Sequence, residues 1–266
     1  MTKEQGQKIK EERLGTTRLN KHNEEMKVIE YNSNADITVE FQDEYKTHVH
    51  TAWDNFVKGG VRNPYRKSIF GVGVIGEKYP ISINSTFLKE YKTWAGILQR
   101  CFDSKKKIEL PTYKEATICD EWLLYENFYE WLHNQENFDK WLNGDKWNID
   151  KDIIVKGNKL YSPETCCLVP GYVNIIFTKR NNYRGDYPIG VYKPKNSNKY
   201  KARCHVGTGE KDRTIGYFNT CEEAFNAYKN VKEKYIKEVA QEEYKLGNIT
   251  KACYEAMMKY EVEITD

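Results

Sequence analysis

Long apolar runs are absent from this sequence. No stretch approaches the roughly 18 apolar residues of a membrane-spanning helix. Residues 1–13 are polar and charged, where a signal peptide would be apolar. We therefore expect no membrane association, and a soluble protein that stays in the cytoplasm.

Metal-binding cysteine patterns are also absent. The seven cysteines include no C-x-x-C pair, and no histidine stands near them at the spacing of a zinc site. An odd number of scattered cysteines is typical of reduced, mostly buried thiols, and we expect that state here.

A strong overall charge is missing as well, because the formal net charge is only +3. The distribution is more informative than the total. Residues 179–213 contain ten basic residues and three acidic ones, whereas residues 109–152 lean acidic. A local positive excess of this kind favours a nucleic-acid-binding segment.

The length of 266 residues favours several compact units over one. The patterns predict an α+β protein with a polar tail at 1–24 and a small, barrel-like β module at 25–82. A largely helical central domain follows at 83–182. A three-stranded antiparallel sheet packed on a helix occupies 183–246, and a C-terminal helix occupies 247–266.

Local periodicity supports this division. Alternating apolar residues at Ile37, Val39 and Phe41 are typical of a half-buried strand. Helical spacing in the central domain predicts two aromatic-rich helices, followed by a strand, turn, strand and helix over 147–176. Near the C-terminus, Thr220 and Glu223 have the spacing of a capping box, which predicts where a long helix begins.

The strand predicted at 199–206 separates two kinds of side chain. Alternate residues of a strand point to opposite faces. Tyr200, Ala202, Cys204 and Val206 therefore share one face, and the intervening basic residues share the other. Arginine and lysine on such a face can donate hydrogen bonds to phosphates and to guanine in the major groove of double-stranded DNA. The candidate DNA contacts are Arg184, Lys193, Lys195, Lys199, Lys201, Arg203, His205 and Arg213.

This C-terminal segment resembles a known module. The resemblance covers about residues 186–243 and rests on Tyr187-Pro188-Ile189-Gly190-Val191-Tyr192, Tyr200-Lys201-Ala202-Arg203, Thr214-Ile215-Gly216-Tyr217-Phe218-Asn219-Thr220, Glu222-Glu223-Ala224 and Ala227-Tyr228. These strings are similar to the APETALA-two/ethylene-response-factor (ERF) DNA-binding domain of plant regulators and phage homing endonucleases. The resemblance implies that the sheet contacts DNA and that the helix supports it.

The central segment is similar to phage HNH-type homing endonucleases over about residues 87–180. The resemblance rests on Trp94, Arg100-Cys101, Cys119-Asp120-Glu121-Trp122, Ile149-Asp150-Lys151-Asp152-Ile153, Gly157-Asn158, Tyr161-Ser162-Pro163, Val169-Pro170 and Asn174. It implies a ββα site in which a histidine general base activates water beside one divalent metal ion. This sequence departs from that pattern: Asp150, Lys151 and Asp152 stand where the strand would carry a histidine, and Thr165 stands where an asparagine is expected. No histidine lies between His133 and His205.

Three functional hypotheses follow. The first is a phage-type DNA-binding protein whose HNH-like domain has lost catalysis, with the aspartates capping turns or pairing with Lys151 and Lys156. The second is an atypical endonuclease or nickase, in which Asp150 and Asp152 bind Mg²⁺ or another divalent metal and Asn174 assists. The third is a phage inhibitor that binds a host defence protein.

Overall fold

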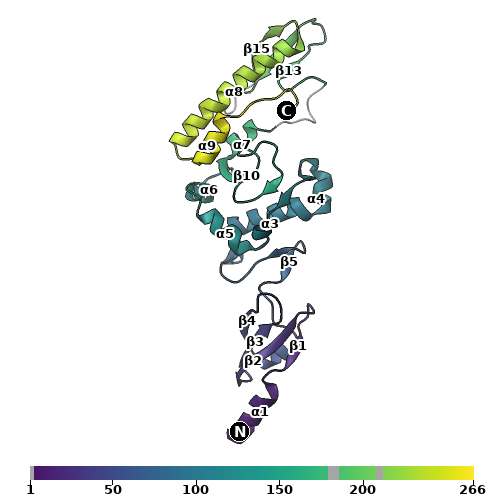
Figure 1. Ribbon diagram of the computed structural model, residues 1–266, viewed down its shortest axis with the longest axis vertical. Helices are drawn as coiled ribbons and strands as arrows, with labels where there is room; N and C mark the ends of the chain where they lie inside the picture. The colour runs from purple at the N-terminus through teal and green to yellow at the C-terminus, as the bar shows by residue number, and fades with distance from the viewer. Residues whose placement is uncertain (1–2, 179–185, 208–211) are drawn as a thin grey trace. The chain divides into compact units, whose positions relative to one another are not determined.

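The protein mixes helices with small sheets. The computed structural model describes residues 3–178, 186–207 and 212–266 (Figure 1). The chain forms two compact units, one of residues 1–103 with 120–129 and the other of residues 104–119 with 130–266. The predicted HNH-like segment, residues 83–182, contributes to both units.

The first unit begins with a four-stranded antiparallel sheet in sequential order (Figure 1). Its strands are β1 (Thr17–Leu19), β2 (Glu25–Ser33), β3 (Asp36–Phe41) and β4 (His48–Thr51). The alternating residues predicted for β3 enter the core, together with Phe56 from α2 (Trp53–Val57). The short helix thus covers the apolar face of the sheet.

The N-terminal segment differs from the expected polar tail. It forms α1 (Lys3–Arg13), and β1 extends the sheet by pairing with β2. The guanidinium of Arg13 lies 4.2 Å from the ring centroid of Trp53 and donates to the hydroxyl of Tyr31 at 2.9 Å. These distant contacts hold a helix that has no apolar stripe of its own.

Aromatic side chains pack together in the rest of the first unit. Its elements are β5 (Lys67–Ile69), β6 (Gly73–Val74), β7 (Ser82–Ile83), β8 (Thr86–Phe87), α3 (Lys89–Phe102), the 3-10 helix η2 (Asp120–Leu123) and the beginning of α5 (Tyr125–His133). The buried indole of Trp94 donates to the carbonyl of Trp122 at 2.7 Å, and Trp94 also packs on Tyr125. Trp94, Trp122 and Tyr125 are therefore core side chains.

The second unit contains the central strand pair. Its first elements are α4 (Ser104–Glu109), η1 (Pro111–Tyr113), β9 (Thr117–Ile118), α6 (Phe138–Asn143), β10 (Trp147–Asp150), β11 (Leu160–Tyr161), β12 (Cys167–Pro170) and α7 (Gly171–Ile176). β10 pairs with β12 in antiparallel fashion, and β9 pairs with β11 in parallel. The first strand of the segment predicted over 147–176 ends at Asp150, because that carboxylate accepts two backbone N–H groups and turns the chain.

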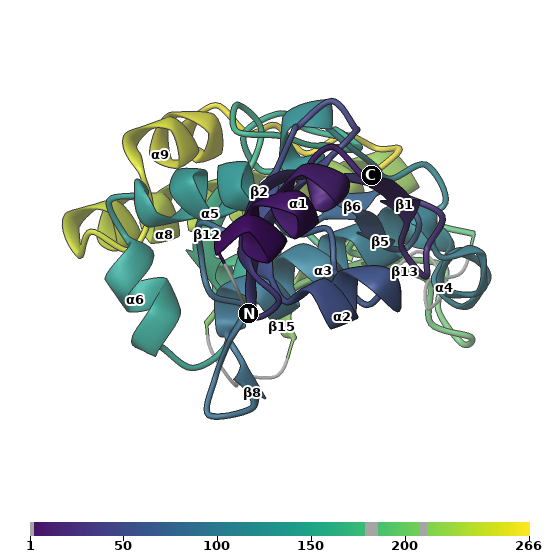
Figure 2. The same cartoon turned by 90° about the horizontal axis from the view of Figure 1, so that it is seen from below.

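The C-terminal part is a three-stranded antiparallel sheet against a long helix (Figure 1). Its elements are β13 (Val191–Tyr192), β14 (Tyr200–Cys204), β15 (Arg213–Phe218), α8 (Cys221–Lys245) and α9 (Lys251–Met258). Ala202 and Cys204 pack against Ala224, Phe225 and Tyr228 of α8. α9 lies beside α8 in both views (Figure 2).

Two local features fix how α8 meets the sheet. The predicted capping box is present: the Thr220 hydroxyl accepts from the Glu223 N–H, and the Glu223 carboxylate accepts from the Thr220 N–H. Gly190 has φ +78°, and a Cβ there would lie 2.1 Å from the ring of Tyr228. Only glycine allows the start of β13 to approach the helix so closely.

The cysteines are free thiols. None of the seven forms a disulfide, and five are buried. Among the described residues, no helix is both long and apolar enough to cross a lipid bilayer.

Candidate nucleic-acid interface

The strand β14 sorts its side chains as the sequence predicts. Ala202 and Cys204 are fully buried against α8, whereas Arg203 and His205 are exposed and Lys201 is half-buried on the opposite side. We call the solvent-facing side of the β13–β14–β15 sheet the outer face. It brings Lys201, Arg203 and His205 together.

Two tyrosines complete the outer face. Tyr192 pairs with Lys201 across β13 and β14, and Lys201 pairs with Tyr217 across β14 and β15. Directly paired residues share a face, and the two tyrosines are 48% and 54% exposed. The Lys201 ammonium lies 5.6 Å from the Tyr217 ring, and the Arg203 guanidinium lies 5.6 Å from the Tyr192 ring. The two tyrosines are not among the predicted contacts, although alternation along β13 and β15 places them on this face.

The carboxylate of Asp212 lies beside basic side chains of the outer face. Asp212 is 3.9 Å from Arg203 and 3.6 Å from His205, measured between charged atoms. All three side chains are about half exposed, and exposed ion pairs of this kind contribute only about 0–1 kcal/mol. Asp212 therefore reduces the positive charge of the face without cancelling it.

Two predicted contacts lie away from the outer face. Arg213 pairs with Cys204, so it points to the helix side, where it lines a small cavity with Val231 and Glu238 of α8. The ammonium of Lys193 lies 4.8 Å from the ring of Tyr200, which packs toward the same core. The structure does not bring these cations together with Arg203.

The remaining predicted contacts fall outside the paired strands. Lys195 and Lys199 are exposed in the connection between β13 and β14. Arg184 lies outside the described residues. Over the described segments 186–207 and 212–218, six basic residues stand against two acidic ones, so the local positive excess persists.

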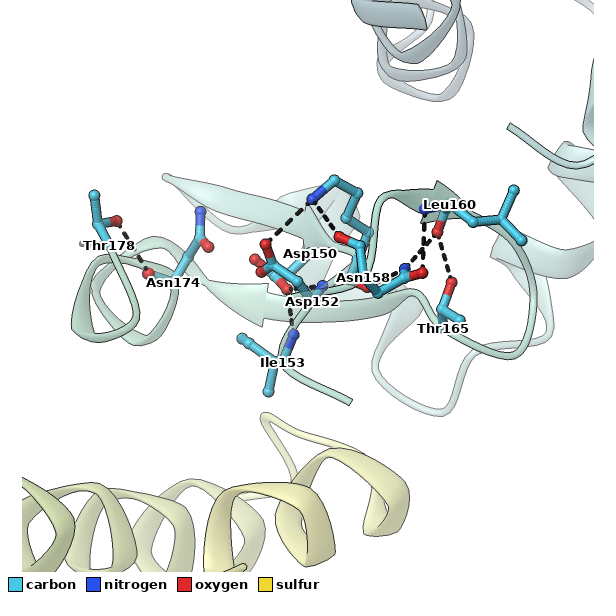
Figure 3. Close-up of polar contacts among 9 residues, drawn as sticks. Asp150, Asp152, Ile153, Asn158, Leu160, Thr165, Asn174 and Thr178 are labelled. Carbon is cyan, nitrogen blue, oxygen red and sulfur yellow. Dashed lines mark hydrogen bonds and ion pairs between the residues drawn. The ribbon is translucent and has the colours of Figure 1, made fainter. Parts of the chain in front are cut away.

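The aspartate pair at the end of β10 is held by internal contacts (Figure 3). One oxygen of Asp150 accepts the N–H groups of Asp152 and Ile153, both at 2.8 Å. The ammonium of Lys151 donates to Asp152 at 3.2 Å and to the carbonyl of Asn158 at 3.1 Å. Asp150 therefore caps a turn and Asp152 pairs with Lys151, whereas Lys156 pairs with Glu263 and Asp266.

Burial changes the acidity of Asp150. Asp150 is 8% exposed. Burial raises the pKa of Asp150 to about 7, and the neighbouring Asp152 carboxylate acts in the same direction. The two backbone N–H donors act in the opposite direction and are outweighed.

These contacts do not fit a divalent metal. The Lys151 ammonium occupies the position beside Asp152 that a cation would take, and one Asp150 oxygen is committed to the backbone. Asn174 lies on α7, and Figure 3 marks no hydrogen bond from its side chain to either aspartate. Among the described residues, no group of three or more His, Cys, Asp or Glu side chains is arranged to hold a metal ion.

Comparison with known protein families, with curated proteins and with solved structures found no significant match to this chain. The residues themselves therefore carry the functional argument.

Proposed function

We propose that this protein binds double-stranded DNA through the outer face of the β13–β14–β15 sheet. One observation carries the proposal: Lys201 and Arg203 point outward from a strand whose alternate residues, Ala202 and Cys204, are fully buried. Packing against α8 fixes the strand, and so holds the two cations toward solvent.

The chemistry of the outer face suits a polyanion. Arginine can donate two parallel hydrogen bonds to a phosphate or to a guanine edge, and lysine donates to phosphates. Tyr192 and Tyr217 are exposed residues, and their hydroxyls add donors that can fix the position of the sheet on the DNA backbone. A pleated sheet narrow enough to enter the major groove is a known mode of readout.

The wider architecture is part of the same proposal. Three antiparallel strands followed by a long capped helix support placing residues 186–243 with the APETALA-two/ERF class. The β10, β12 and α7 arrangement supports an HNH-like scaffold in the centre of the chain. The contacts of Asp150 and Asp152 favour a structural role over hydrolysis in that scaffold.

The test is duplex binding by fluorescence anisotropy at fixed salt. A Lys201→Glu, Arg203→Glu double variant should lose about a hundredfold or more in affinity, because two attractive contacts become repulsive. The matched control is Lys234→Glu, Lys237→Glu, which makes the same change of charge on exposed positions of α8.

The control should lose much less affinity than the sheet variant. Circular dichroism and unfolding curves establish that both variants fold. Equal losses in the two variants, or parental affinity in a folded sheet variant, would exclude the outer face as the contact surface. Stoichiometric capture of a host protein without DNA binding would favour the inhibitor hypothesis.

A further inference from the structure

The first unit holds a cavity that DNA binding by the sheet does not use. Its volume is about 470 Å³, within the range of roughly 300–1,000 Å³ typical of small-molecule sites. Three of its lining side chains are basic or can become so, Arg62, Arg66 and His22, against one acidic residue, Glu77. The apolar part of the wall includes Pro64, Ile75 and Ile81.

The two arginines have no carboxylate partner among the described residues. Neither Arg62 nor Arg66 forms a salt bridge there, although Glu77 lines the same cavity. Guanidinium groups recognise phosphates through paired N–H donors, and unpaired arginines keep those donors available. The cavity therefore has the charge and the donors of an anion site.

Buried polar side chains hold both walls in place. On one wall, Asn63 is 8% exposed and donates to Asp43 at 2.7 Å, while its oxygen accepts the N–H of Tyr65 at 3.0 Å. On the other wall, the carboxylate of Glu126 accepts the N–H groups of Glu77 and Lys78, both at 2.8 Å.

The two walls are also joined. The N–H of Gly76 donates to the carbonyl of Pro64 at 3.1 Å, and the hydroxyl of Tyr65 lies 3.4 Å from a Glu126 oxygen. A site whose walls are fixed before binding loses less entropy when it takes a ligand.

We propose that this cavity binds a phosphomonoester of nucleotide size. Arg62 and Arg66 hold the phosphate, and the apolar wall contacts the nucleoside. The ligand has two sources with the same chemistry, namely a free mononucleotide and the 5′-phosphorylated end of a nucleic-acid strand.

Calorimetric titration of the full chain tests the proposal, with deoxyadenosine 5′-monophosphate, deoxyadenosine and inorganic phosphate as probes. The monophosphate should bind with a Kd of about 10–100 µM, and the other two at least tenfold more weakly, because each lacks half of the recognised chemistry. Equal binding of inorganic phosphate or of the nucleoside, or no binding of the monophosphate, overturns the proposal.

Variants connect binding to the cavity. The Arg62→Ala, Arg66→Ala double variant should bind the monophosphate at least tenfold more weakly than the parent. Lys67 is an exposed cation of the same segment that does not line the cavity, so Lys67→Ala should leave the affinity for the monophosphate unchanged. Arg62→Lys, Arg66→Lys keeps the charge and should still weaken binding several-fold, because lysine lacks the paired donors. Parental affinity in a folded alanine or lysine variant overturns the proposal.

A 5′-phosphorylated tetradeoxyadenylate separates the two sources. Binding at least tenfold tighter than the monophosphate assigns the cavity to strand ends, and equal or weaker binding assigns it to free nucleotides. The titrations are repeated in the Lys201→Glu, Arg203→Glu background. Binding that persists there belongs to the cavity, and monophosphate binding that disappears there contradicts the proposal.

Discussion

The outer face of the C-terminal sheet and the aspartate pair of the central strands both carry charged side chains that the sequence marks as candidates. They differ in what those side chains contact. Asp150 and Lys151 are buried and bonded to neighbouring backbone. Lys201 and Arg203 lie above a packed layer and contact tyrosine rings, and Arg203 also lies near the half-exposed carboxylate of Asp212.

This difference distinguishes charged side chains that stabilise the fold from charged side chains that are available to bind a ligand. A charged group whose donors or acceptors are satisfied internally contributes to the local structure, and its removal leaves buried partners unsatisfied. A charged group held toward solvent by the packing of its neighbours stabilises the fold little and remains available to a ligand. We therefore assign structure to the central pair and binding to the outer face.

The largest expected effect comes from the close packing beneath the outer face. Gly190→Ala should destabilise the protein by on the order of 3 kcal/mol, because the new Cβ would meet the Tyr228 ring and φ is +78°. Gly157→Ala is the matched change in the central region, with φ +77° and open space around its Cβ. It should cost only about 1 kcal/mol. Urea unfolding measures the loss of stability in both variants. Equal losses would show that contact with the Tyr228 ring is not what makes Gly190→Ala costly.

The second effect concerns Asp150 and pH. The folded chain holds a proton on this carboxyl up to about pH 7, whereas an ordinary carboxyl releases it near pH 4. The parent therefore loses stability as pH rises from about 4 to 7. Asp150→Asn keeps the oxygen that accepts the backbone N–H groups and carries no charge.

This substitution should stabilise the folded chain by on the order of 2 kcal/mol at pH 9 and by little at pH 4. Denaturant unfolding of parent and variant across this pH range provides the measurement. Destabilisation of the variant that appears above about pH 7 would show that the ionised carboxylate itself stabilises the folded chain, which would contradict this account of Asp150.

The third effect distinguishes the two faces of the C-terminal sheet. Arg203→Ala should weaken duplex binding by about 1 kcal/mol, or roughly fivefold, through lost phosphate or base contacts. Arg213→Ala removes the same charge from the helix side and should weaken binding less than twofold. Anisotropy titrations measure the duplex affinity of both variants. A larger loss of affinity for Arg213→Ala than for Arg203→Ala would show that DNA contacts the other face of the sheet.

Two features of the C-terminal region could be predicted from neighbouring residues alone. The alternation along β14 and the Thr220–Glu223 capping box follow from period-two geometry and from hydrogen-bond spacing, and both are present. The face of the sheet on which Arg213 lies depends on a register shift between Ala202 and Arg203. That shift moves Arg213 from opposite His205 to opposite Cys204, and nothing in the residue types reveals it.

Other features depended on contacts between distant residues. α1 has a single large apolar residue, Ile9, which packs against the core of the first unit, and Trp53, the contact partner of Arg13, lies 40 positions further along the chain. The early end of β10 depends on which hydrogen bonds Asp150 forms, since the same residue type is compatible with an exposed strand. Residue types and spacing alone therefore leave the role of Asp150 open between capping a turn and binding a metal ion.

Salt dependence of duplex binding tests the central claim most directly. On a plot of log affinity against log salt concentration, each neutralised phosphate contributes about 0.9 to the slope. If Lys201 and Arg203 contact phosphates, replacing both with alanine should reduce the parental slope by about 1 to 2. A parental slope in a folded double-alanine variant would show that the DNA lies elsewhere on the protein.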